Sequence, residues 1–467
     1  MRKLKDRRSF IWPLLLLLTC FINPAYTPEL VKQDKPNILL ILTDDQGSID
    51  MNCYGASDLY TPNMDRLANE GTRFTQFYAA APVCSPSRAA LLTGKTNLRA
   101  GLWGNVPVPA YAEIKQKYGM PTEQVTMAEV LKKNGYFTGL VGKWHLGHKP
   151  ETLPNGQGFD HYFGHQGGCI DNYSHFMFWS GPNMHDLYRN KQEVYKPGEF
   201  FPDLMVREIK SILDEERDQP FFIYWAFNAP HYPYQGEPKW MEHYKDLPTP
   251  RKEYAAFVST ADEKIGEVLD ELDRRGLTEN TIVIFQSDHG HSVEERAFWG
   301  GGNSGDYRGS KFSLFEGGIR VPAIIRYPGV VPENQVRDQA CIEMDWMATI
   351  AELTETDISE LHIDGISLMP VIQDETAASP HDVLYWQQGS YNDNQAQWAV
   401  RSGDWKLIGN PRDPTLSEPL KDKLFLANLK MDISEQENLL EKYPEEGKRL
   451  QELHDNWLKE VRKEMNK

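Results

Sequence analysis

Four short runs of apolar residues stand out along the chain, and each has the length of a β-strand. They are Asn37–Thr43, Phe137–Gly142, Phe221–Phe227 and Thr281–Gln286. Nearly continuous apolar runs of this kind are typical of strands that are buried on both faces, as in a parallel sheet. The four runs therefore predict the central strands of one buried sheet.

Segments with helical periodicity lie between these runs. In Thr126–Asn134 and in Tyr254–Arg275, apolar residues recur every three or four positions. Strands that alternate with helices predict an α/β fold, in which helices flank a mainly parallel sheet. We expect this large domain to cover residues 35–380.

The pattern changes after about residue 380. Trp398–Ile408 predicts a hairpin that turns at Ser402–Asp404, and Leu424–Leu429 predicts a further strand. Pro444–Val461 has apolar residues at helical spacing and predicts an amphipathic helix. Residues 381–467 are therefore expected to form a smaller C-terminal domain.

The N-terminus has the pattern of a signal peptide. Basic residues precede an apolar run over Ile11–Ile22, which is short for a membrane span. We expect residues 1–26 to be a signal peptide and the mature protein to be secreted or periplasmic, with no transmembrane span. The sequence Leu-Leu-Thr before Cys20 leaves a lipoprotein anchor as a weaker alternative.

Charge and cysteine content exclude some classes of protein. The formal net charge of −17 argues against nucleic acid or an anionic membrane surface as the partner. The chain has 5 cysteines, too few for a disulfide framework, although one bridge stays open. An anionic substrate would need a locally cationic site on this acidic chain.

Charged or imidazole side chains follow each of the four apolar runs. They are Asp44 and Asp45 after the first run, Lys143 and His145 after the second, Asn228 and His231 after the third, and Asp288 and His289 after the fourth. Sites in open parallel sheets form beyond the carboxyl ends of the strands. We therefore expect these side chains to meet at one edge of the sheet.

The run Cys84–Gly94, with the sequence Cys-Ser-Pro-Ser-Arg-Ala-Ala-Leu-Leu-Thr-Gly, predicts a helix with a reactive atom at its tip. Pro86 suits the first helical position, which places Cys84 or Ser85 near the cap. Arg88 comes four residues after Cys84, so both side chains can share one face. A sulfur atom beside an arginine and a helix N-terminus makes a site for negative charge.

This run is similar to the signature of the type I sulfatases of the alkaline phosphatase superfamily, Cys-x-Pro-x-Arg followed by Thr-Gly. The resemblance implies that Cys84 is oxidised to formylglycine by a formylglycine-generating or sulfatase-maturing enzyme. The hydrate of this aldehyde then supplies the nucleophilic oxygen. The resemblance also implies an alkaline-phosphatase-like α/β domain and a small C-terminal α+β domain with an antiparallel sheet and a helix.

Adjacent carboxylates at Asp44 and Asp45 indicate a cation between them, since like charges repel and hard oxygen ligands suit Ca²⁺ or Mg²⁺. The resemblance implies that Asp44, Asp45, Asp288, His289 and the residue derived from Cys84 hold the metal, with Ca²⁺ the usual ion. Because an imidazole is a softer ligand than an amide oxygen, Mg²⁺ and Zn²⁺ stay open.

The resemblance implies roles for the remaining polar residues. Lys143 and Lys311 bind the sulfate, and Arg88 orients the aldehyde hydrate. His145 assists the hydrate and its later collapse. His231 binds sulfate and protonates the leaving oxygen.

Secretion and sulfatase chemistry together point to a sulfated extracellular glycan as the substrate, with sulfate removed from a terminal sugar, ahead of small aryl or steroid sulfates. Polar groups for sugar hydroxyls are available in the aromatic-rich segment Gly167–Trp179, although packing explains its aromatic residues equally well. These groups are Asp171, Asn172, Tyr173 and His175, with Trp299 and Arg401 as further candidates for the pocket. The alternatives are a phosphoester or phosphonate hydrolase of the same fold, and a glycan-binding protein that has lost catalysis.

Overall fold

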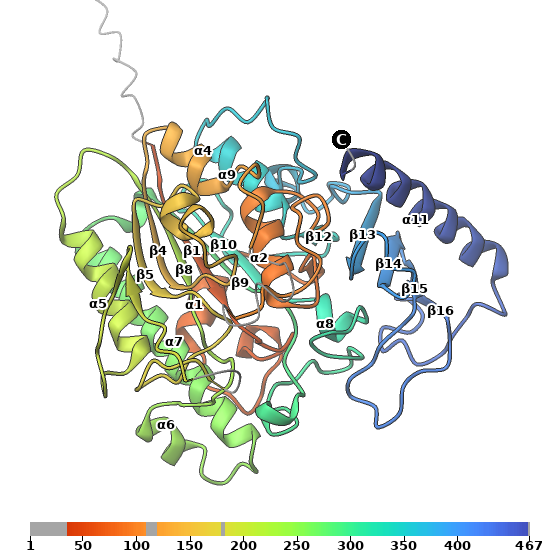
Figure 1. Ribbon diagram of the computed structural model, residues 1–467, viewed down its shortest axis with the longest axis horizontal. Coiled ribbons are helices and arrows are strands. Elements are labelled where there is room, and N and C mark those ends of the chain that lie inside the picture. The colour runs from red at the N-terminus through yellow and green to blue at the C-terminus, as the bar shows by residue number, and fades with distance from the viewer. Residues whose placement is uncertain (1–34, 109–118, 179–182, 466–467) are drawn as a thin grey trace, which may run out of the picture. The chain divides into compact units, whose positions relative to one another are not determined.

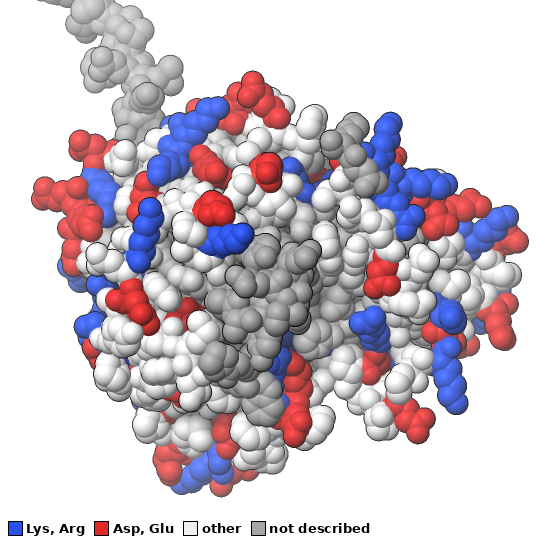
Figure 2. Space-filling model, viewed as in Figure 1, with Lys and Arg blue, Asp and Glu red and all other residues white. Residues whose placement is uncertain are grey.

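The computed structural model describes residues 35–108, 119–178 and 183–465. The predicted signal peptide, residues 1–26, lies outside this part of the chain. Within it, no helix is long and apolar enough to cross a membrane. Its four cysteines, Cys53, Cys84, Cys169 and Cys341, are free, so no bridge links the described cysteines. Figure 2 shows acidic and basic side chains interspersed over the face in view, without one continuous acidic patch.

The four predicted strands lie side by side and parallel at the centre of a ten-stranded sheet (Figure 1). Their order in the sheet is β9 (Thr281–Ser287), β1 (Asn37–Thr43), β8 (Phe221–Ala226) and β4 (Phe137–Lys143). In register, Leu40 of β1 lies opposite Tyr224 of β8 and Ile284 of β9. The strand predictions are confirmed to within one residue at each end.

Shorter strands extend the sheet on both sides. Beyond β9 come β10 (Ala323–Arg326), β2 (Thr72–Phe74) and β11 (Gln335–Arg337), and beyond β4 come β5 (His161–His165), β6 (Tyr188–Arg189) and β7 (Gln192–Glu193). β10 runs antiparallel to both of its neighbours, and β5 runs parallel to β4. A separate small sheet pairs β3 (Phe77–Tyr78) with β12 (Cys341–Ile342). The main sheet is therefore mixed but parallel at its centre, as the fold class predicts.

Alternate side chains of the central strands face two different layers of helices (Figure 1). Leu39 and Ile41 belong to the core shared with α1 (Pro62–Asn69), α5 (Phe201–Asp214) and α7 (Arg251–Arg274). Leu40 belongs to the core shared with α2 (Cys84–Thr93), α4 (Met127–Lys133) and α9 (Asp345–Leu353). Shorter helices are α6 (Pro238–His243), α8 (Glu316–Ile319) and α10 (Met369–Gln373). The continuous apolar strands follow from this burial on both faces.

Two predicted helices are confirmed. The helix predicted over Tyr254–Arg275 is α7 (Arg251–Arg274). The helix predicted over Thr126–Asn134 is α4, and its N-cap Thr126 accepts a hydrogen bond from the N–H of Glu129 at 3.1 Å. The Glu129 carboxylate in turn accepts one from the N–H of Thr126 at 2.7 Å. This capping box satisfies two N–H groups that the helix start leaves unpaired.

Helix α2 begins earlier than predicted. Its first residue is Cys84 and its N-cap is Val83, so Pro86 occupies the third helical position and not the first. Proline is tolerated there because the first N–H groups of a helix have no intrahelical partner. The helix ends at Gly94, whose φ of 65° is the left-handed conformation that suits glycine. Cys84 therefore lies in the first turn, where free N–H groups favour negative charge.

The C-terminal residues form a four-stranded antiparallel sheet covered by one long helix (Figure 1). The strands are β13 (Val383–Gln388), β14 (Gln397–Ser402), β15 (Trp405–Gly409) and β16 (Leu424–Asn428), and the helix is α11 (Pro444–Met465). Leu450 of α11 packs in a core with Val400 and Leu407. The hairpin, the added strand and the terminal helix are thus confirmed, whereas the domain boundary at residue 380 stays a prediction.

Candidate active site

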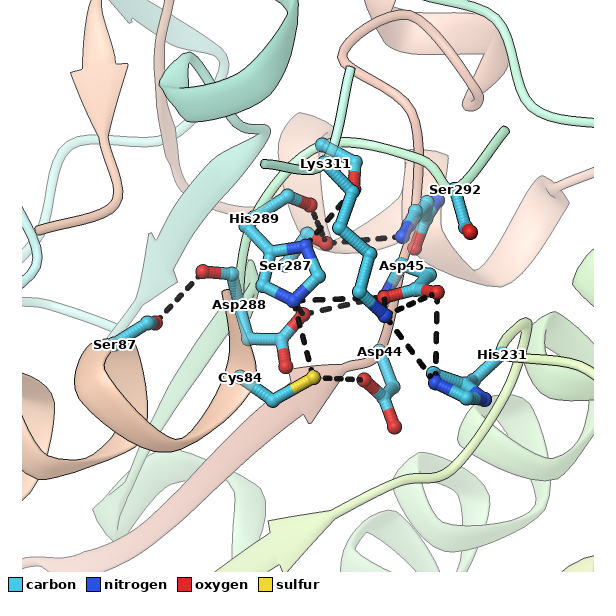
Figure 3. Close-up of polar contacts among 12 residues, drawn as sticks. Asp44, Asp45, Cys84, Ser87, His231, Ser287, Asp288, His289, Ser292 and Lys311 are labelled. Carbon is cyan, nitrogen blue, oxygen red and sulfur yellow. Dashed lines mark hydrogen bonds and ion pairs between the residues drawn. The ribbon is translucent and has the colours of Figure 1, made fainter. Parts of the chain in front are cut away.

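The candidate active site lies where the central parallel strands end (Figure 3). Its residues are Asp44 and Asp45 after β1, Lys143 at the end of β4, His231 after β8, Asp288 and His289 after β9, and Cys84 in the first turn of α2. Lys311 enters from the loop that precedes α8. The strand-end pattern therefore identified side chains that meet in space, although they are spread over more than half of the chain.

Asp44 is fully buried and surrounded by cations. Its carboxylate accepts a hydrogen bond from Lys143 Nζ at 2.7 Å, and it lies 3.5 Å from Arg88 Nη2. Burial alone would raise the pKa of Asp44, but the charges of Lys143 and Arg88 hold it well below the usual value. Asp44 is therefore ionised. The Cys84 sulfur lies 3.8 Å from Asp44 Oδ1.

Asp45 is equally buried but less well compensated. Lys311 Nζ donates to its two oxygens at 2.8 and 2.9 Å, and His289 Nε2 lies 3.5 Å away. Burial nevertheless raises the pKa of Asp45 to about 7. Its N–H donates to Asp288 Oδ1 at 3.2 Å. A carboxylate held in this way calls for further positive charge beside it.

The Cys84 sulfur lies in a strongly cationic environment. It is 3.2 Å from His289 Nε2. Burial would raise the pKa of the Cys84 thiol, but Lys143, Lys311 and His289 lower it well below its usual value. Burial would lower the pKa of His289, but Asp288 and Cys84 raise it to about 9. This position is therefore organised to hold a negatively charged atom.

Four side chains offer donor atoms for a metal within 4.8 Å of one another: Asp44, Asp45, Cys84 and His289. All four are buried, and two carboxylate oxygens with a nitrogen and a sulfur suit a divalent cation. The fifth predicted ligand, Asp288, lies beside this group and pairs with Arg88 at 2.9 Å. Burial raises the pKa of Asp288 to about 6, so it too would gain from a neighbouring cation. These residues fit a metal, and the identity of the ion stays a prediction.

In an extended strand, Lys143 and His145 would point to the same side because they are two residues apart, but the structure does not continue the strand that far. β4 ends at Lys143, and His145 has a φ of 58°, so the chain has already left the extended conformation. His145 lies in the loop after β4. Its backbone carbonyl accepts a hydrogen bond from Ser85 Oγ at 2.7 Å. The side chain of His145 lies close enough to Cys84 for each to affect the other electrostatically. Both residues therefore reach the site, but by a different backbone route.

Unlike the pKa of His289, the pKa values of the buried histidines His145 and His231 are lowered, because burial disfavours the charged ring. His231 Nδ1 lies 2.7 Å from the carbonyl of Tyr232, and its Nε2 lies 3.3 Å from Lys311 Nζ. His145 Nε2 lies 3.1 Å from the carbonyl of Val106. Since a carbonyl can only accept, His231 Nδ1 and His145 Nε2 carry the protons of the neutral rings.

A cavity of about 230 Å³ opens beside Cys84. Its lining comprises Cys84, Asn105–Val108, His145, Gly168, Cys169, Met177, Phe178, His231, Tyr232, Arg296 and Lys311. Asn105, Tyr232 and Arg296 are lining residues that the sequence interpretation missed. Tyr232 could have been found from its place next to His231, whereas nothing local marks Asn105 or Arg296.

Several residues predicted for the pocket lie elsewhere. Arg401 does not line the cavity and instead donates to Gln76 Oε1 at 2.5 Å and to the hydroxyl of Tyr78, so its assignment to the pocket is wrong. Trp299 is 72% exposed and does not line the cavity.

Within the predicted segment Gly167–Trp179, the cavity is lined by Gly168, Cys169, Met177 and Phe178. The predicted sugar contacts Asp171, Asn172, Tyr173 and His175 are not among the lining residues, and Trp179 lies outside the described part of the chain. Asp171 and Asn172 instead hydrogen-bond to the side-chain amide of Gln235. His175 Nε2 lies 3.0 Å from the carbonyl of Glu199. Asp171, Asn172 and His175 therefore connect the segment to neighbouring parts of the fold.

Comparisons with known proteins agree with this geometry. Residues 36–356 match the family model described as Sulfatase, and residues 306–464 match the model described as N-sulphoglucosamine sulphohydrolase, C-terminal. Human arylsulfatase A is 33% identical over 442 residues, which cover 87% of this chain and 83% of that protein. Human N-acetylgalactosamine-6-sulfatase is 37% identical over 355 residues, which cover 72% of this chain and 66% of that protein.

A solved structure has the same fold as this chain. The crystal structure of Ps i-CgsB superimposes with a TM-score of 0.80 and 29% identity, and the match covers 91% of this chain and 93% of that chain. The same protein has been solved in complex with k-i-k-neocarrahexaose. The chain therefore belongs to the sulfatase family, and it is an enzyme that hydrolyses sulfate esters.

Proposed function

We propose that this sulfatase releases sulfate from a terminal sugar of an extracellular sulfated glycan, through a formylglycine derived from Cys84. The observation that carries the proposal is the position of Cys84. Its sulfur lies in the first turn of α2, 3.8 Å from Asp44 and 3.2 Å from His289, and it lines the cavity. An oxygen nucleophile at this position would meet the same cationic environment.

Two groups supplied after synthesis complete the proposed site. The formylglycine hydrate would supply the nucleophilic oxygen, and a divalent cation, of which Ca²⁺ is the first choice, would offset negative charge on the nucleophile and the sulfate. Asp44, Asp45, Asp288, His289 and the residue at position 84 would hold the cation. Conversion of Cys84 requires a formylglycine-generating or sulfatase-maturing enzyme as a partner.

Lys143 and Lys311 are assigned to binding the sulfate oxygens. Both ammonium groups are buried in the site and already donate to Asp44 and Asp45. Burial would lower the pKa of both lysines, but these carboxylates raise it, so both stay charged. Arg88 pairs with Asp288 and lies 3.5 Å from Asp44, from where it would orient the nucleophile.

His231 is assigned as the acid that protonates the leaving oxygen. In the neutral ring Nδ1 donates to the carbonyl of Tyr232, so Nε2 accepts from Lys311. Protonation turns Nε2 into a donor for the departing alcohol. Because burial lowers the pKa of His231, the protonated ring gives up this proton more readily than an ordinary imidazolium.

His145 is assigned as the base that removes the second hydroxyl proton of the hydrate when the aldehyde re-forms. Its Nε2 donates to the carbonyl of Val106, which leaves Nδ1 as the acceptor. Nδ1 is buried and has no hydrogen-bond partner among the described residues. The lowered pKa of His145 keeps this nitrogen unprotonated at neutral pH.

Galactose-type sugars are the first candidates for the substrate. One relative is named for N-acetylgalactosamine 6-sulfate, and a similar structure has been solved with a neocarrahexaose. The cavity of about 230 Å³ is smaller than typical drug-sized pockets, which suits one sugar ring with its sulfate.

The test is sulfate release from a panel of defined sulfated mono- and disaccharides, measured by ion chromatography on protein matured in a co-expressing host. Mass analysis of the peptide that contains Cys84 should show formylglycine. Cys84→Ala should abolish release and leave the far-UV circular dichroism near that of the parent. Release by Cys84→Ala would overturn the proposed nucleophile, and faster hydrolysis of nitrophenyl phosphate or a phosphonate ester would favour the alternative hydrolase.

A further inference from the structure

We propose that Arg296 determines substrate specificity by binding a second anionic group, a carboxylate or a second sulfate ester, on the sugar whose sulfate is released. The inference rests on the proposed function and names the class of sugar more closely. It assigns a role to a cavity residue that the proposed chemistry does not use.

Arg296 lines the same cavity as the reactive groups. It belongs to the short turn Glu295–Ala297, and its side chain is 28% exposed. Lys311, which is assigned to the sulfate, lines the cavity as well. The two residues therefore face the same cavity, where one bound sugar can reach both.

The guanidinium group of Arg296 is held in place before any ligand binds. Its Nε and Nη2 both donate to Glu294 Oε1, at 3.0 and 2.7 Å. The other oxygen of Glu294 accepts from the hydroxyl of Tyr232 at 2.9 Å and from Ser292 Oγ at 3.1 Å. The guanidinium carbon also lies 4.9 Å from the centroid of the Tyr232 ring. Such a preorganised arginine loses little further freedom on binding a ligand.

Among the described residues, none accepts a hydrogen bond from the remaining donors of Arg296. An arginine has five N–H donors, and the hydrogen bonds of Arg296 to described residues use only Nε and Nη2. Its planar fork of donors matches the oxygens of a carboxylate or a sulfate, which a single sugar hydroxyl does not. An anionic substituent is therefore the ligand that this group fits best.

The other cations of the site are bound to candidate metal ligands. Lys143 binds Asp44, Lys311 binds Asp45, and Arg88 binds Asp288. Arg296 binds Glu294, which is outside the group of metal donors. Burial would raise the pKa of Glu294, but Lys311 and Arg296 lower it, so this carboxylate stays charged and keeps Arg296 oriented. Glu294 also lies 3.9 Å from Lys311 Nζ, so Arg296 neighbours the sulfate-binding lysine without being bound to a candidate metal ligand.

The experiment compares three matched sugars that carry the same scissile sulfate. One has no other charge, one has a second sulfate ester, and one has a carboxylate at the ring. We expect the parent enzyme to prefer one of the two doubly anionic sugars, and the choice between them identifies the second group. Arg296→Gln should reduce kcat/KM for that sugar by roughly 10- to 100-fold more than for the singly charged sugar, mainly through KM.

Two variants serve as controls. Arg296→Lys keeps the charge without the fork and should restore part of the preference. Arg449→Gln removes an arginine that pairs with Glu446 on α11, away from the cavity lining, and should leave the preference unchanged. Equal losses for all three sugars in Arg296→Gln would show a merely structural role and overturn the inference.

The inference and the proposed function fail in different ways. Release of sulfate without a preference for a doubly anionic sugar overturns the inference alone. Absence of release from every sugar overturns both, because the doubly anionic sugar is then not a substrate.

Discussion

Glu343 is a buried carboxyl group behind the active site, and its hydrogen bonds require it to be neutral. Its Oε1 accepts from the N–H of Ala80 at 2.7 Å. Its Oε2 lies 3.0 Å from Ser87 Oγ and 3.0 Å from Gln286 Nε2. The single hydroxyl proton of Ser87 is donated to the carbonyl of Asp288 at 2.7 Å. The proton between Ser87 and Glu343 must then belong to Glu343.

The magnitude follows from the pKa of this group. Burial raises the pKa of Glu343 from 4.5 to about 8. Because the folded-state pKa is raised, its contribution to stability is fully present below pH 4.5 and is lost as the pH rises to about 8. Over these three and a half pH units, at about 1.4 kcal/mol each, the loss is about 5 kcal/mol.

The perturbation is Glu343→Gln, and the measurement is the free energy of unfolding in urea at several pH values between 4.5 and 8. Glutamine cannot ionise, so the variant should lose about 5 kcal/mol less than the parent over this range. A 2.6 Å hydrogen bond from Trp346 Nε1 to Gln286 Oε1 fixes the orientation of the Gln286 amide, so Gln286 Nε2 faces position 343. In the variant an NH₂ group replaces the oxygen that accepts from Gln286 Nε2. The lost hydrogen bond should cost about 1 kcal/mol at every pH. Glu333→Gln, at an exposed carboxylate, controls for the loss of a charge. Parallel pH profiles of parent and Glu343→Gln would show that Glu343 is ionised when folded and refute the reasoning.

Three other perturbations test the fold and the metal site. Gly142→Ala should destabilise the protein by more than about 3 kcal/mol, because φ is 117° and the new Cβ would lie 2.0 Å from the carbonyl oxygen of Ala226. Gly135→Ala, with φ of 89° and nothing within 4 Å, should cost only about 1 to 2 kcal/mol, and equal losses in urea unfolding would contradict the steric argument. Thr126→Ala should cost about 1 kcal/mol through its lost cap, and an unchanged melting temperature would contradict this. Chelation of divalent cations should lower both the melting temperature and sulfate release, and Ca²⁺ should restore both; indifference to the chelator would contradict a metal at the four buried donors.

The central strands and the strand-end residues were predictable because both depend on local pattern. A strand buried on both faces needs an apolar residue at nearly every position, and parallel strands carry their carboxyl ends to the same edge. Asp44, Lys143 and Asp288 could therefore be grouped before their distances were known. The order of the strands in the sheet was not predicted, because it depends on how the connecting helices pack.

The errors concern features that local sequence does not encode. β2 and β10 have three and four residues, too few for an apolar run to mark them. Arg401 was predicted to line the pocket, but it forms a hydrogen bond with Tyr78, 323 residues away. His145 takes a left-handed conformation that alternation cannot anticipate. In each case, a contact distant in sequence or an unusual backbone angle decided the outcome.

The charge balance of the site explains how an acidic chain can attract an anionic substrate. Lys143 and Lys311 are the cations assigned to sulfate, yet each is bound to a carboxylate, Asp44 or Asp45. These pairs alone offer little net positive charge to an anion. A divalent cation between the two carboxylates would offset them and leave both ammonium groups to the sulfate oxygens. We therefore infer that sulfate binding depends on the cation even where the lysines make the contacts. A competitive oxyanion such as sulfate should bind more weakly to chelated protein, and equal affinity with and without Ca²⁺ would contradict this charge argument.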